Sequence, residues 1–412
     1  MPSSVVVGGG AVGTAIAQTL QLSGFTVSLI DPCDAQRPAS WGNAGHIAIE
    51  QIAPLASFAT LRGVPRRLVA AHGGLSLPLR ALPQWLPFSV RFLLAARPGR
   101  AAAGKEALRQ LLADAMAAWE RYAVQLRQPG LVRADGHFIV WSHPAAAERG
   151  RRNWLEADCG QAYFREASAD EYTQLRMLTV KPIAGAIRCV GSGQIADLDV
   201  FATAARAAFL AAGGAMIRSR AVRLAHEAGR VRVELASGRH LDADHVIVAA
   251  GVGSRPLLEQ LGHRVPLIAE RGYHVQFGAQ RWPQTLPPIV FEEDATIVTR
   301  FQDVVRASSY LEFNRPMAPA DPHKWDRIEA VTREWGLPLA PRVSTWVGSR
   351  PTFPDYLPAI GKSRIADNLY YAFGHQHLGL TLAPITAELM GEMIRGGGIA
   401  DHLGPFDLAR FD

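Results

Sequence analysis

Residues 5–18 read VVVGGGAVGTAIAQ, and this stretch decides the fold. Three valines favour a buried strand, the glycines favour a tight turn, and the residues that follow favour a helix. Gly8, Gly10 and Gly13 fit the spacing G-x-G-x-x-G, and a second apolar strand, FTVSLID, ends at Asp31. A strand–turn–helix–strand unit that ends in an acid is typical of a Rossmann-like dinucleotide-binding domain.

Each part of this motif has a mechanical role in binding phosphate. Gly8 permits the turn, Gly10 lets the backbone approach a pyrophosphate, and Gly13 lets the helix pack closely on the strand. The first helical N–H groups, near Ala11 and Val12, face the phosphates, and Asp31 accepts hydrogen bonds from ribose hydroxyls. A glycine-rich turn that binds nothing is the alternative, and the context disfavours it. The motif predicts an adenine dinucleotide and leaves NAD and FAD open, since both carry the same ADP half.

Length and composition set the broad class. The chain has 412 residues, of which 48% are hydrophobic and 19% charged, so we expect a globular protein with two lobes. The longest apolar stretch, WLPFSVRFLLAA (85–96), is too short to cross a bilayer. No basic and apolar leader precedes the first strand, so we expect a cytoplasmic location. The three cysteines lack metal-ligand spacing, and neither a disulfide framework nor a zinc site is expected.

Positive charge is concentrated in one segment. The net charge is +6, and no acidic residue occurs between Glu50 and Glu106. Apolar residues alternate there with basic ones, namely Arg62, Arg66, Arg67, Arg80, Arg91, Arg97, Arg100 and Lys105. The segment 51–105 is interpreted as helices with a solvated basic face, and contact with a membrane surface or a partner protein is the alternative. No nucleic-acid-binding motif accompanies the charge, so nucleic acid is not expected as a partner.

Two later stretches favour FAD over NAD. ADHVIVAAG (243–251) and LPAIGKSRIADNLYYAFGHQHLGLT (357–381) resemble recurrent strands of two-domain flavoproteins. In those proteins the C-terminal strand–turn–helix closes on the flavin, and a helix that starts near 374–381 stabilises negative charge on the reduced ring. No second G-x-G-x-x-G is present for a nicotinamide cofactor. We therefore expect reoxidation by oxygen, a quinone or another protein.

Six blocks in order resemble the D-amino-acid oxidase/dehydrogenase superfamily of FAD enzymes, in particular bacterial D-amino-acid dehydrogenases and glycine-oxidase-like enzymes. These blocks are VVVGGGAVGTAIA, PASWGNAGHIA (38–48), VIVAAGVGS (246–254), PLIAERGYHV (266–275), WVGSRPTFPDYLPAIG (346–361) and NLYYAFGHQHLGLT (368–381).

The resemblance implies a fold and a domain division. The fold class is α/β with an α+β second lobe, in which a Rossmann-like FAD-binding domain joins an antiparallel-sheet substrate domain. Residues 1–55, 190–262 and 346–412 are expected in the first domain. Residues 56–189 and 263–345 are expected in the second, with a helical insertion near 55–130 that includes a single long helix over 101–127.

The resemblance also implies how non-covalent FAD is held. In SWGNAG, the backbone of Asn43, Ala44 and Gly45 is expected at the flavin and Ser40 nearer the pyrophosphate, while Val222 is expected at the adenine edge. Covalent attachment through cysteine is not expected, because no cysteine follows Cys189. The cofactor-binding residues expected in full are Gly8, Gly10, Ala11, Val12, Gly13, Asp31, Ser40, Asn43, Ala44, Gly45, Val222, Ala250, Gly251, Gly374, His375, Leu378, Gly379 and Thr381.

Four residues are candidates for catalysis. The resemblance places Arg350 at the substrate carboxylate, where a planar guanidinium binds bidentately, and a structural salt bridge is the alternative. Tyr273 and Tyr310 are expected to line the substrate lobe, where an ordinary half-buried tyrosine is equally compatible with the pattern. His46 stands where related dehydrogenases more often have glutamine, so its contact is open. His375 and His377 lack further ligands at metal spacing, and no metal site is expected.

The implied function is FAD-dependent oxidation of an amine beside a carboxylate. Hydride leaves Cα for flavin N5, and the imine hydrolyses to a keto acid and ammonia, or remains cyclic or substituted if the nitrogen is substituted. Acyclic D-amino acids and cyclic ones resembling D-proline or hydroxyproline are the expected substrates. The alternatives are glycine or sarcosine oxidation, and a flavin subunit of a multi-component dehydrogenase that docks a partner through 51–105.

Overall fold

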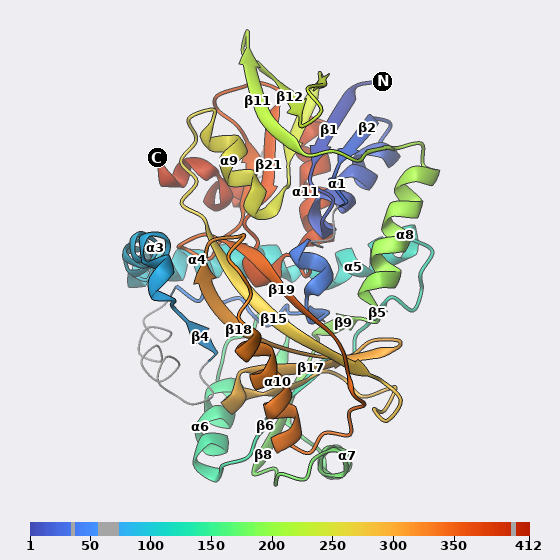
Figure 1. Ribbon diagram of the computed structural model, residues 1–412, viewed down its shortest axis with the longest axis vertical. Helices are drawn as coiled ribbons and strands as arrows, with labels where there is room; N and C mark the ends of the chain where they lie inside the picture. Colours follow the sequence, from blue (N-terminus) through green and yellow to red (C-terminus); the bar gives the residue numbers. More distant parts are fainter. Residues whose placement is uncertain (34–37, 57–73, 397–400) are drawn as a thin grey trace.

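The computed structural model describes residues 1–33, 38–56, 74–396 and 401–412. Two large sheets dominate it, one in the upper half of Figure 1 and one crossing the middle and lower half. Both ends of the chain lie in the upper half. The segment 57–73, which contains Arg62, Arg66 and Arg67, lies outside the described residues.

The upper sheet has six strands, and all neighbours are parallel except the last pair. In order they are β10 (Ala215–Ile217), β2 (Thr26–Ile30), β1 (Ser3–Val7), β14 (His245–Val248), β21 (Leu369–Phe373) and β20 (Ala359–Lys362).

Both faces of this sheet are covered, which explains why its strands are apolar throughout. One face packs on α1 (Ala11–Leu22), α8 (Leu198–Ala211) and α11 (Ala383–Ile394). The other face packs on a small sheet of β11 (Ala221–Glu227), β12 (Arg230–Leu235) and β13 (His240–Leu241) and on the short helix α9 (Ser254–Glu259). The predicted Rossmann-like domain is confirmed.

The second large sheet is mostly antiparallel, as predicted, with parallel pairing only between β16 and β6 and between β4 and β18. In order its strands are β19 (Arg342–Thr352), β15 (Ile268–Gly278), β18 (Val304–Asn314), β17 (Thr296–Arg300), β16 (Ile289–Phe291), β6 (His137–Trp141), β8 (Gly185–Val190) and β7 (Tyr163–Glu166), with β4 (Leu75–Ser76) beside β18.

Helices α6 (Pro144–Leu155), α7 (Ala169–Leu178) and α10 (Pro322–Glu334) pack on this sheet. A third, short sheet consists of β3 (His46–Ile47), β9 (Gly193–Ile195) and β5 (Val132–Arg133).

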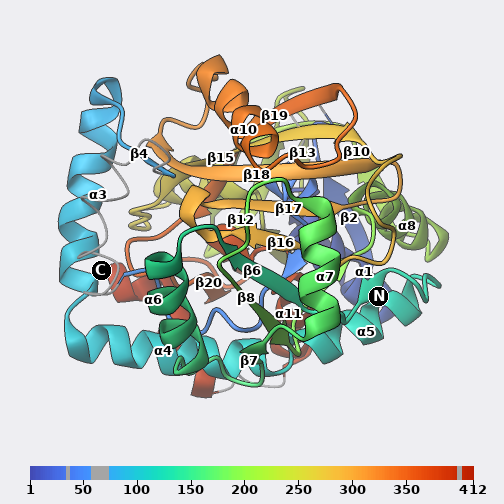
Figure 2. The same ribbon diagram turned by 90° about the horizontal axis from the view of Figure 1, so that it is seen from below.

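The helical insertion differs from the prediction of one long helix over 101–127. It contains α3 (Leu82–Ala95), α4 (Pro98–Ala113) and α5 (Ala115–Gln125), and the helix is interrupted between the last two at Asp114. Figure 2 shows α3 along one edge and α4 and α5 across the molecule. The sequence did not predict this break, because only one residue interrupts the helix and the helical periodicity is present on both sides of Asp114.

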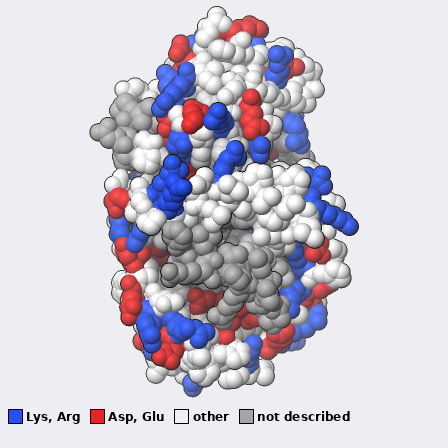
Figure 3. Space-filling view, turned by 90° about the vertical axis from the view of Figure 1, so that its left-hand side faces the viewer, with Lys and Arg blue, Asp and Glu red and all other residues white. Residues whose placement is uncertain are grey.

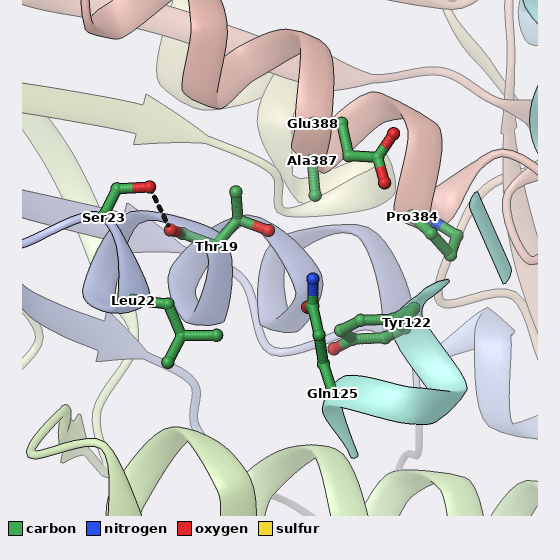
Figure 4. Close-up of a pocket in the computed structure, with 8 residues that line it drawn as sticks. All are labelled: Thr19, Leu22, Ser23, Tyr122, Gln125, Pro384, Ala387 and Glu388. Carbon is green, nitrogen blue, oxygen red and sulfur yellow. Dashed lines mark hydrogen bonds between the residues drawn. The ribbon is translucent and has the colours of Figure 1, made fainter. Parts of the chain in front are cut away.

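Helix α5 packs against the dinucleotide-binding domain. Arg121 Nε donates to Glu388 Oε1 on α11 at 2.9 Å, and the Tyr122 hydroxyl donates to Gln18 on α1 at 3.0 Å. The three helices enclose a small cleft of about 140 Å³, lined by Tyr122, Gln125 and Glu388 among others (Figure 4). Helix α5 of the insertion therefore packs on helices of the first domain, although the predicted boundaries assign the insertion to the second domain.

The expected boundary at residue 346 falls inside β19, which pairs with β15 along its length. The division of the chain into two domains at this residue stays a prediction. None of the helices in the described ranges is long and apolar enough to cross a membrane.

Candidate active site

The glycine turn is packed so tightly that side chains cannot be accommodated. Gly8 follows β1 with φ +115°, a left-handed conformation that favours glycine, and its N–H donates to Ile30 O at 2.9 Å. A Cβ on Gly13 would overlap the carbonyl oxygen of Gly8, and one on Gly9 would lie 2.6 Å from Asp31 Oδ2. The sequence pattern did not assign a role to Gly9, whose N–H donates to Asp31 Oδ2 at 2.8 Å.

The turn leaves the start of α1 open to a ligand. Gly10 caps the helix without a side-chain hydrogen bond, and the Ala11 N–H donates to Ser40 Oγ at 3.1 Å. The remaining first-turn N–H groups have no partner within the helix, and they place positive charge at its end. Asp31 lies beside this end, where it also accepts the Cys33 N–H at 2.8 Å.

Ala250 and Gly251 complete this edge, because they follow β14 and Ala249 N–H donates to Val7 O at 2.8 Å. The predicted residues from β1, β2 and β14 therefore meet at the carboxyl edge of the sheet, where α/β proteins bind nucleotides. An open helix start, a carboxylate and a turn without Cβ atoms fit the ADP half of FAD. Val222 lies on the outer face of β11, 40% exposed, and its role at the adenine stays a prediction.

The loop at 42–45 is fixed by the second domain. The Asn43 side chain accepts the Gly45 N–H at 2.8 Å, and Gly45 has φ +79°. His274 Nδ1 lies 3.0 Å from Gly42 O, and Arg306 donates to the carbonyl oxygen of Asn43. These contacts from β15 and β18 hold the backbone of the loop in place, as a flavin-binding role requires.

The C-terminal turn differs in detail from the prediction of a helix start near 374–381. Residues 376–378 form a single 3-10 turn, and α11 begins only at Ala383. Gly374 has φ +79° and packs against Phe353, and the side chains of Leu378 and Thr381 are buried. Pro384 lies in the first turn of α11, a position that suits proline because its missing N–H would have no partner within the helix.

Two polar side chains of this turn are engaged by the protein. His375 Nε2 lies 3.1 Å from Thr386 Oγ1 on α11, and burial lowers the pKa of His375 to about 3. The Thr381 hydroxyl oxygen accepts the Ala48 N–H at 2.9 Å. A contact of His375 or Thr381 with flavin would therefore have to involve the backbone or the remaining lone pairs.

A cavity of about 900 Å³ lies between the two domains, and Arg350 on β19 lines it. The guanidinium is held from one side, because its Nη1 donates to Glu270 Oε1 and to Tyr310 O, both at 3.3 Å. Its side chain remains 25% exposed, whereas that of Glu270 is fully buried. A Cβ on Gly272 would lie 3.1 Å from Nη1 and closer still to Nη2, so glycine there makes room for the guanidinium.

Arg350 forms the salt bridge that was its structural alternative, with Glu270 as the partner. The printed bonds of the guanidinium use Nη1, and binding of a substrate carboxylate by Nε and Nη2 stays a prediction. Sequence reasoning missed Glu270 and Tyr356, whose hydroxyl donates to Glu270 Oε2 at 2.9 Å. Glu270 could have been singled out in the sequence, because it is an acidic residue directly after the apolar run PLIA of the block PLIAERGYHV. No sequence pattern singles out Tyr356.

The two predicted tyrosines lie next to each other at this cavity, with ring centroids 5.9 Å apart. The Tyr273 hydroxyl donates to Glu312 Oε2 at 2.9 Å and accepts the Asp321 N–H at 3.2 Å, so the structure engages it in a buried ion cluster. Tyr310 has φ +72°, an unfavourable backbone conformation for an aromatic residue. Such strain concentrates at functional sites. Of the two hydroxyls, that of Tyr310 is the one better placed to meet a ligand.

His46 lines the same cavity and belongs to a polar cluster with Glu50 and His137. Burial lowers the pKa of His46 to about 4, raises that of Glu50 to about 8, and lowers that of His137 well below its ordinary value. Burial therefore disfavours the charged form of each of the three side chains. Sequence reasoning missed Glu50 and His137, which no local motif marks.

His377 also reaches the cavity, where its Nε2 lies 2.5 Å from Gln51 Oε1. Burial lowers the pKa of His377 to about 3, so the imidazole is neutral. His375 and His377 each have a partner of their own, and the structure does not bring them together with a third ligand among the described residues.

Comparisons with known proteins agree with this geometry. The family model described as "FAD dependent oxidoreductase" matches residues 4–393. The chain is 29% identical to a D-amino-acid oxidase of Bradyrhizobium diazoefficiens over 98% of both chains, and 27% identical to D-amino acid dehydrogenase 2 of Pseudomonas aeruginosa over 94% of both. The fold resembles glycine oxidase from Geobacillus kaustophilus, with a TM-score of 0.75, 17% identity and coverage of 100% and 99%. The chain therefore belongs to the FAD-dependent oxidoreductase family, whose cofactor is FAD.

Proposed function

We propose that the protein oxidises the Cα–N bond of a D-amino acid or a cyclic amino acid. The observation that carries this proposal is Arg350, a guanidinium held by a buried carboxylate in the wall of a large cavity between the domains. A planar cation in that position is suited to the carboxylate of an amino acid. The names of the two curated relatives, a D-amino-acid oxidase and a D-amino acid dehydrogenase, support the same substrate class.

The residues that would hold FAD fall into two groups. The ADP half would lie on the turn from Gly8 to Gly13, beside Asp31 and Ser40. The flavin would lie between the Asn43–Gly45 loop and the C-terminal turn. When bound, FAD supplies the acceptor for the hydride that leaves Cα.

The chain's own residues orient the substrate for this step. Arg350 binds the carboxylate through Nε and Nη2, since Glu270 and Tyr310 O already accept from Nη1. The Tyr310 hydroxyl donates a further hydrogen bond to the carboxylate or the amine. The amine lone pair forms the C=N bond as hydride departs, the nitrogen loses a proton to water, and water hydrolyses the imine. Orientation accounts for most of the acceleration, so no strong general base is required.

The lining of the cavity favours a substrate with an apolar side chain over glycine. The volume of about 900 Å³ includes space beside Asn43 and Ala44, where the flavin is expected, so the lining rather than the volume carries this preference. Aromatic side chains of α3, Phe88 and Phe92, contribute to its lining. Glycine and sarcosine oxidation is thus the second candidate, and substrate profiling separates it from the first.

The experiment is anaerobic reduction of the enzyme-bound flavin by a panel of amino acids. The panel contains D-alanine, D-proline, D-hydroxyproline, their L-enantiomers, glycine and sarcosine. We expect loss of the oxidised-flavin absorbance with D- or cyclic amino acids and little with the L-enantiomers. Reduction by glycine and sarcosine alone would select the second candidate, and reduction by none would overturn the proposal. Repeating the assay with oxygen, a quinone analogue or an artificial acceptor then identifies how the flavin is reoxidised.

We also infer that this enzyme works in the cytoplasm and binds peripherally to an anionic membrane surface through α3. Large apolar side chains recur every three or four residues on the outer face of this helix and the turn before it. These exposed residues are Leu79, Leu82, Leu86, Val90 and Leu94, whereas the exposed Leu93 also lines the large cavity. Burying such a stripe in the boundary between headgroups and acyl chains is favourable, whereas leaving it in water is not.

Charge around α3 supports a lipid surface as the occupant. Exposed Arg91 lies on the helix, Arg80 precedes it, and Arg97 and Arg100 follow it, with no acidic residue anywhere in 51–105. Figure 3 views the side on which α3 lies, and an uncharged band crosses it at mid-height with basic side chains at both ends. Each such residue near an anionic bilayer contributes about 1 kcal/mol.

Vesicle sedimentation tests this surface. We expect binding to vesicles that contain phosphatidylglycerol and weaker binding to neutral phosphatidylcholine or at high salt. The double variant Leu86→Glu/Val90→Glu should abolish binding, whereas Val124→Glu, an exposed position on α5, should not. Absence of binding by the unaltered protein would overturn the inference, and a concentration-dependent dimer lost in the double variant would indicate that a second copy covers α3.

A further inference from the structure

Three donor side chains from two distant parts of the chain meet in the wall of the large cavity. His46 is on β3, Glu50 is in the turn that follows, and His137 is the first residue of β6. Their ligand atoms all lie within 4.8 Å of one another. His46 Nε2 is 3.6 Å from Glu50 Oε1, and the two imidazole centroids are 4.5 Å apart.

The cluster is buried and incompletely hydrogen-bonded. The side chains of His46 and Glu50 are 10% and 2% exposed. Among the described residues, His46 Nε2 and Glu50 Oε2 have no hydrogen-bond partner. Buried polar atoms without partners are costly, and native proteins usually satisfy them with protein groups, water or a bound ligand. These two atoms therefore indicate that something binds between the three side chains.

His137 has a hydrogen bond of the kind that orients a metal-binding histidine. Its Nδ1 lies 3.0 Å from Ser192 Oγ, so Nε2 is the ring nitrogen that this contact does not use. Metal-binding histidines typically use their second ring nitrogen in this way, because the outer hydrogen bond fixes the tautomer and the ring orientation.

We propose that His46, Glu50 and His137 bind a divalent transition-metal ion of the zinc type, with a fourth coordination position open to the cavity. Two imidazole nitrogens and one carboxylate oxygen are a donor set that zinc prefers, whereas calcium and magnesium prefer oxygen ligands alone. Ligands at about 2.0–2.2 Å from a tetrahedral zinc stand roughly 3.4 Å apart. The 3.6 Å between His46 and Glu50 therefore requires little rearrangement.

A bound ion would change the charge of the cavity wall and would offer a coordination position to a ligand. A bound divalent cation together with an ionised Glu50 would carry a net positive charge at this point of the wall. Its open position would accept water or a donor atom of a molecule in the cavity, because His46, Glu50 and His137 all line that space. This proposal goes beyond the oxidation of amino acids and does not depend on it.

Metal binding by the flavin-loaded protein tests the proposal directly. The holoenzyme is treated with a chelator, dialysed and titrated with Co²⁺, whose tetrahedral d–d bands lie at longer wavelength than flavin absorbance, and with Zn²⁺ by calorimetry. We expect one ion per protein molecule. Glu50→Gln and His137→Gln should each abolish this stoichiometric binding, and Ser192→Ala should weaken it about 10- to 100-fold. His226→Gln, at an exposed position on β11, is the matched control and should bind normally.

The flavin absorbance of each variant reports whether it folds. If Glu50→Gln or His137→Gln loses flavin, Ser192→Ala decides, because it keeps all three ligands. Absence of tetrahedral Co²⁺ bands, or equal Zn²⁺ affinity in the unaltered protein and Ser192→Ala, would overturn the metal site. Neither result affects the reduction of flavin by amino acids, so the two proposals fail separately.

Discussion

The two candidate binding regions of this molecule differ in how they are built. At the glycine turn, backbone groups and the absence of side chains shape the candidate cofactor site, with Asp31 and Ser40 as supporting side chains. In the cavity, side chains from strands far apart in the sequence shape the candidate substrate site, as Glu270 and Arg350 illustrate. The glycine turn should lose binding when a side chain is added to it. The cavity should lose binding when one of its side chains is removed.

The largest effect is expected from Gly13→Val. The added side chain would overlap the carbonyl of Gly8 and force the helix away from β1, so the purified protein should contain almost no FAD or fail to fold. The ratio of flavin to protein absorbance measures the loss. Gly99→Ala is the control, because a Cβ there meets nothing within 4 Å. Retention of full FAD by Gly13→Val would show that the turn is not the cofactor site.

Glu312→Gln tests the buried ion cluster beneath the cavity. Glu312 accepts from Arg271 at 2.8 Å and from Lys324, and losing its charge leaves two buried cations unpaired. We expect a loss of about 3–5 kcal/mol in the free energy of unfolding, measured by denaturant titration. Glu148→Gln, from an exposed pair with Arg152, should cost roughly 0–1 kcal/mol.

The effect of Glu312→Gln should depend on pH. Burial alone would raise the pKa of Glu312, and its bonds to Lys324 and Asn314 outweigh this, so the pKa is lower than its ordinary value. The unfolded state then binds more protons than the native state, and the stabilisation is present above the unfolded pKa and lost as pH falls through the folded one. The difference between the two proteins should therefore shrink in acid. A difference that stays constant in acid, down through the folded pKa, would contradict the charged cluster.

Arg350→Ala should affect catalysis more than cofactor binding. The variant would remove the cation that pairs with the substrate carboxylate. We expect this loss to cost about 2–5 kcal/mol, or roughly 30- to 5,000-fold in kcat/KM, with most of the change in KM. Flavin absorbance should be retained, and Arg350→Lys should recover only part of the loss because lysine lacks the planar fork. Arg342→Ala, at the exposed end of the same strand, is the control. Loss of flavin with unchanged KM in the remaining holoenzyme would assign Arg350 a structural role alone.

Ser40→Ala should have the smallest effect. Its hydroxyl accepts one helix N–H, so we expect a cost of about 1 kcal/mol, or roughly fivefold in the Kd for FAD. Fluorescence titration of the apoprotein with FAD measures it. A loss as large as that of Gly13→Val would mean that side chains, rather than the backbone, dominate the cofactor site.

The cavity itself shows what sequence patterns left unassigned. The sequence made Arg350 and the two tyrosines candidates for the substrate site, and it did not predict the buried residues that contact them. The role of the Tyr273 hydroxyl was open in the sequence, and the structure engages it with Glu312, 39 residues away. Glu50 and His137 are 87 residues apart and meet only because β3 and β6 are brought together by folding.

The sequence alone determined the dinucleotide-binding fold, because each of its determinants is local. Strand, turn, helix and acid lie within 31 residues, and the spacing of Gly8, Gly10 and Gly13 follows from the geometry of one turn. Only the tertiary structure decided which groups hold Arg350, where α5 packs, and which side chains complete the cavity. Those contacts depend on strand register and domain packing, which join residues whose separation in the sequence leaves no local pattern.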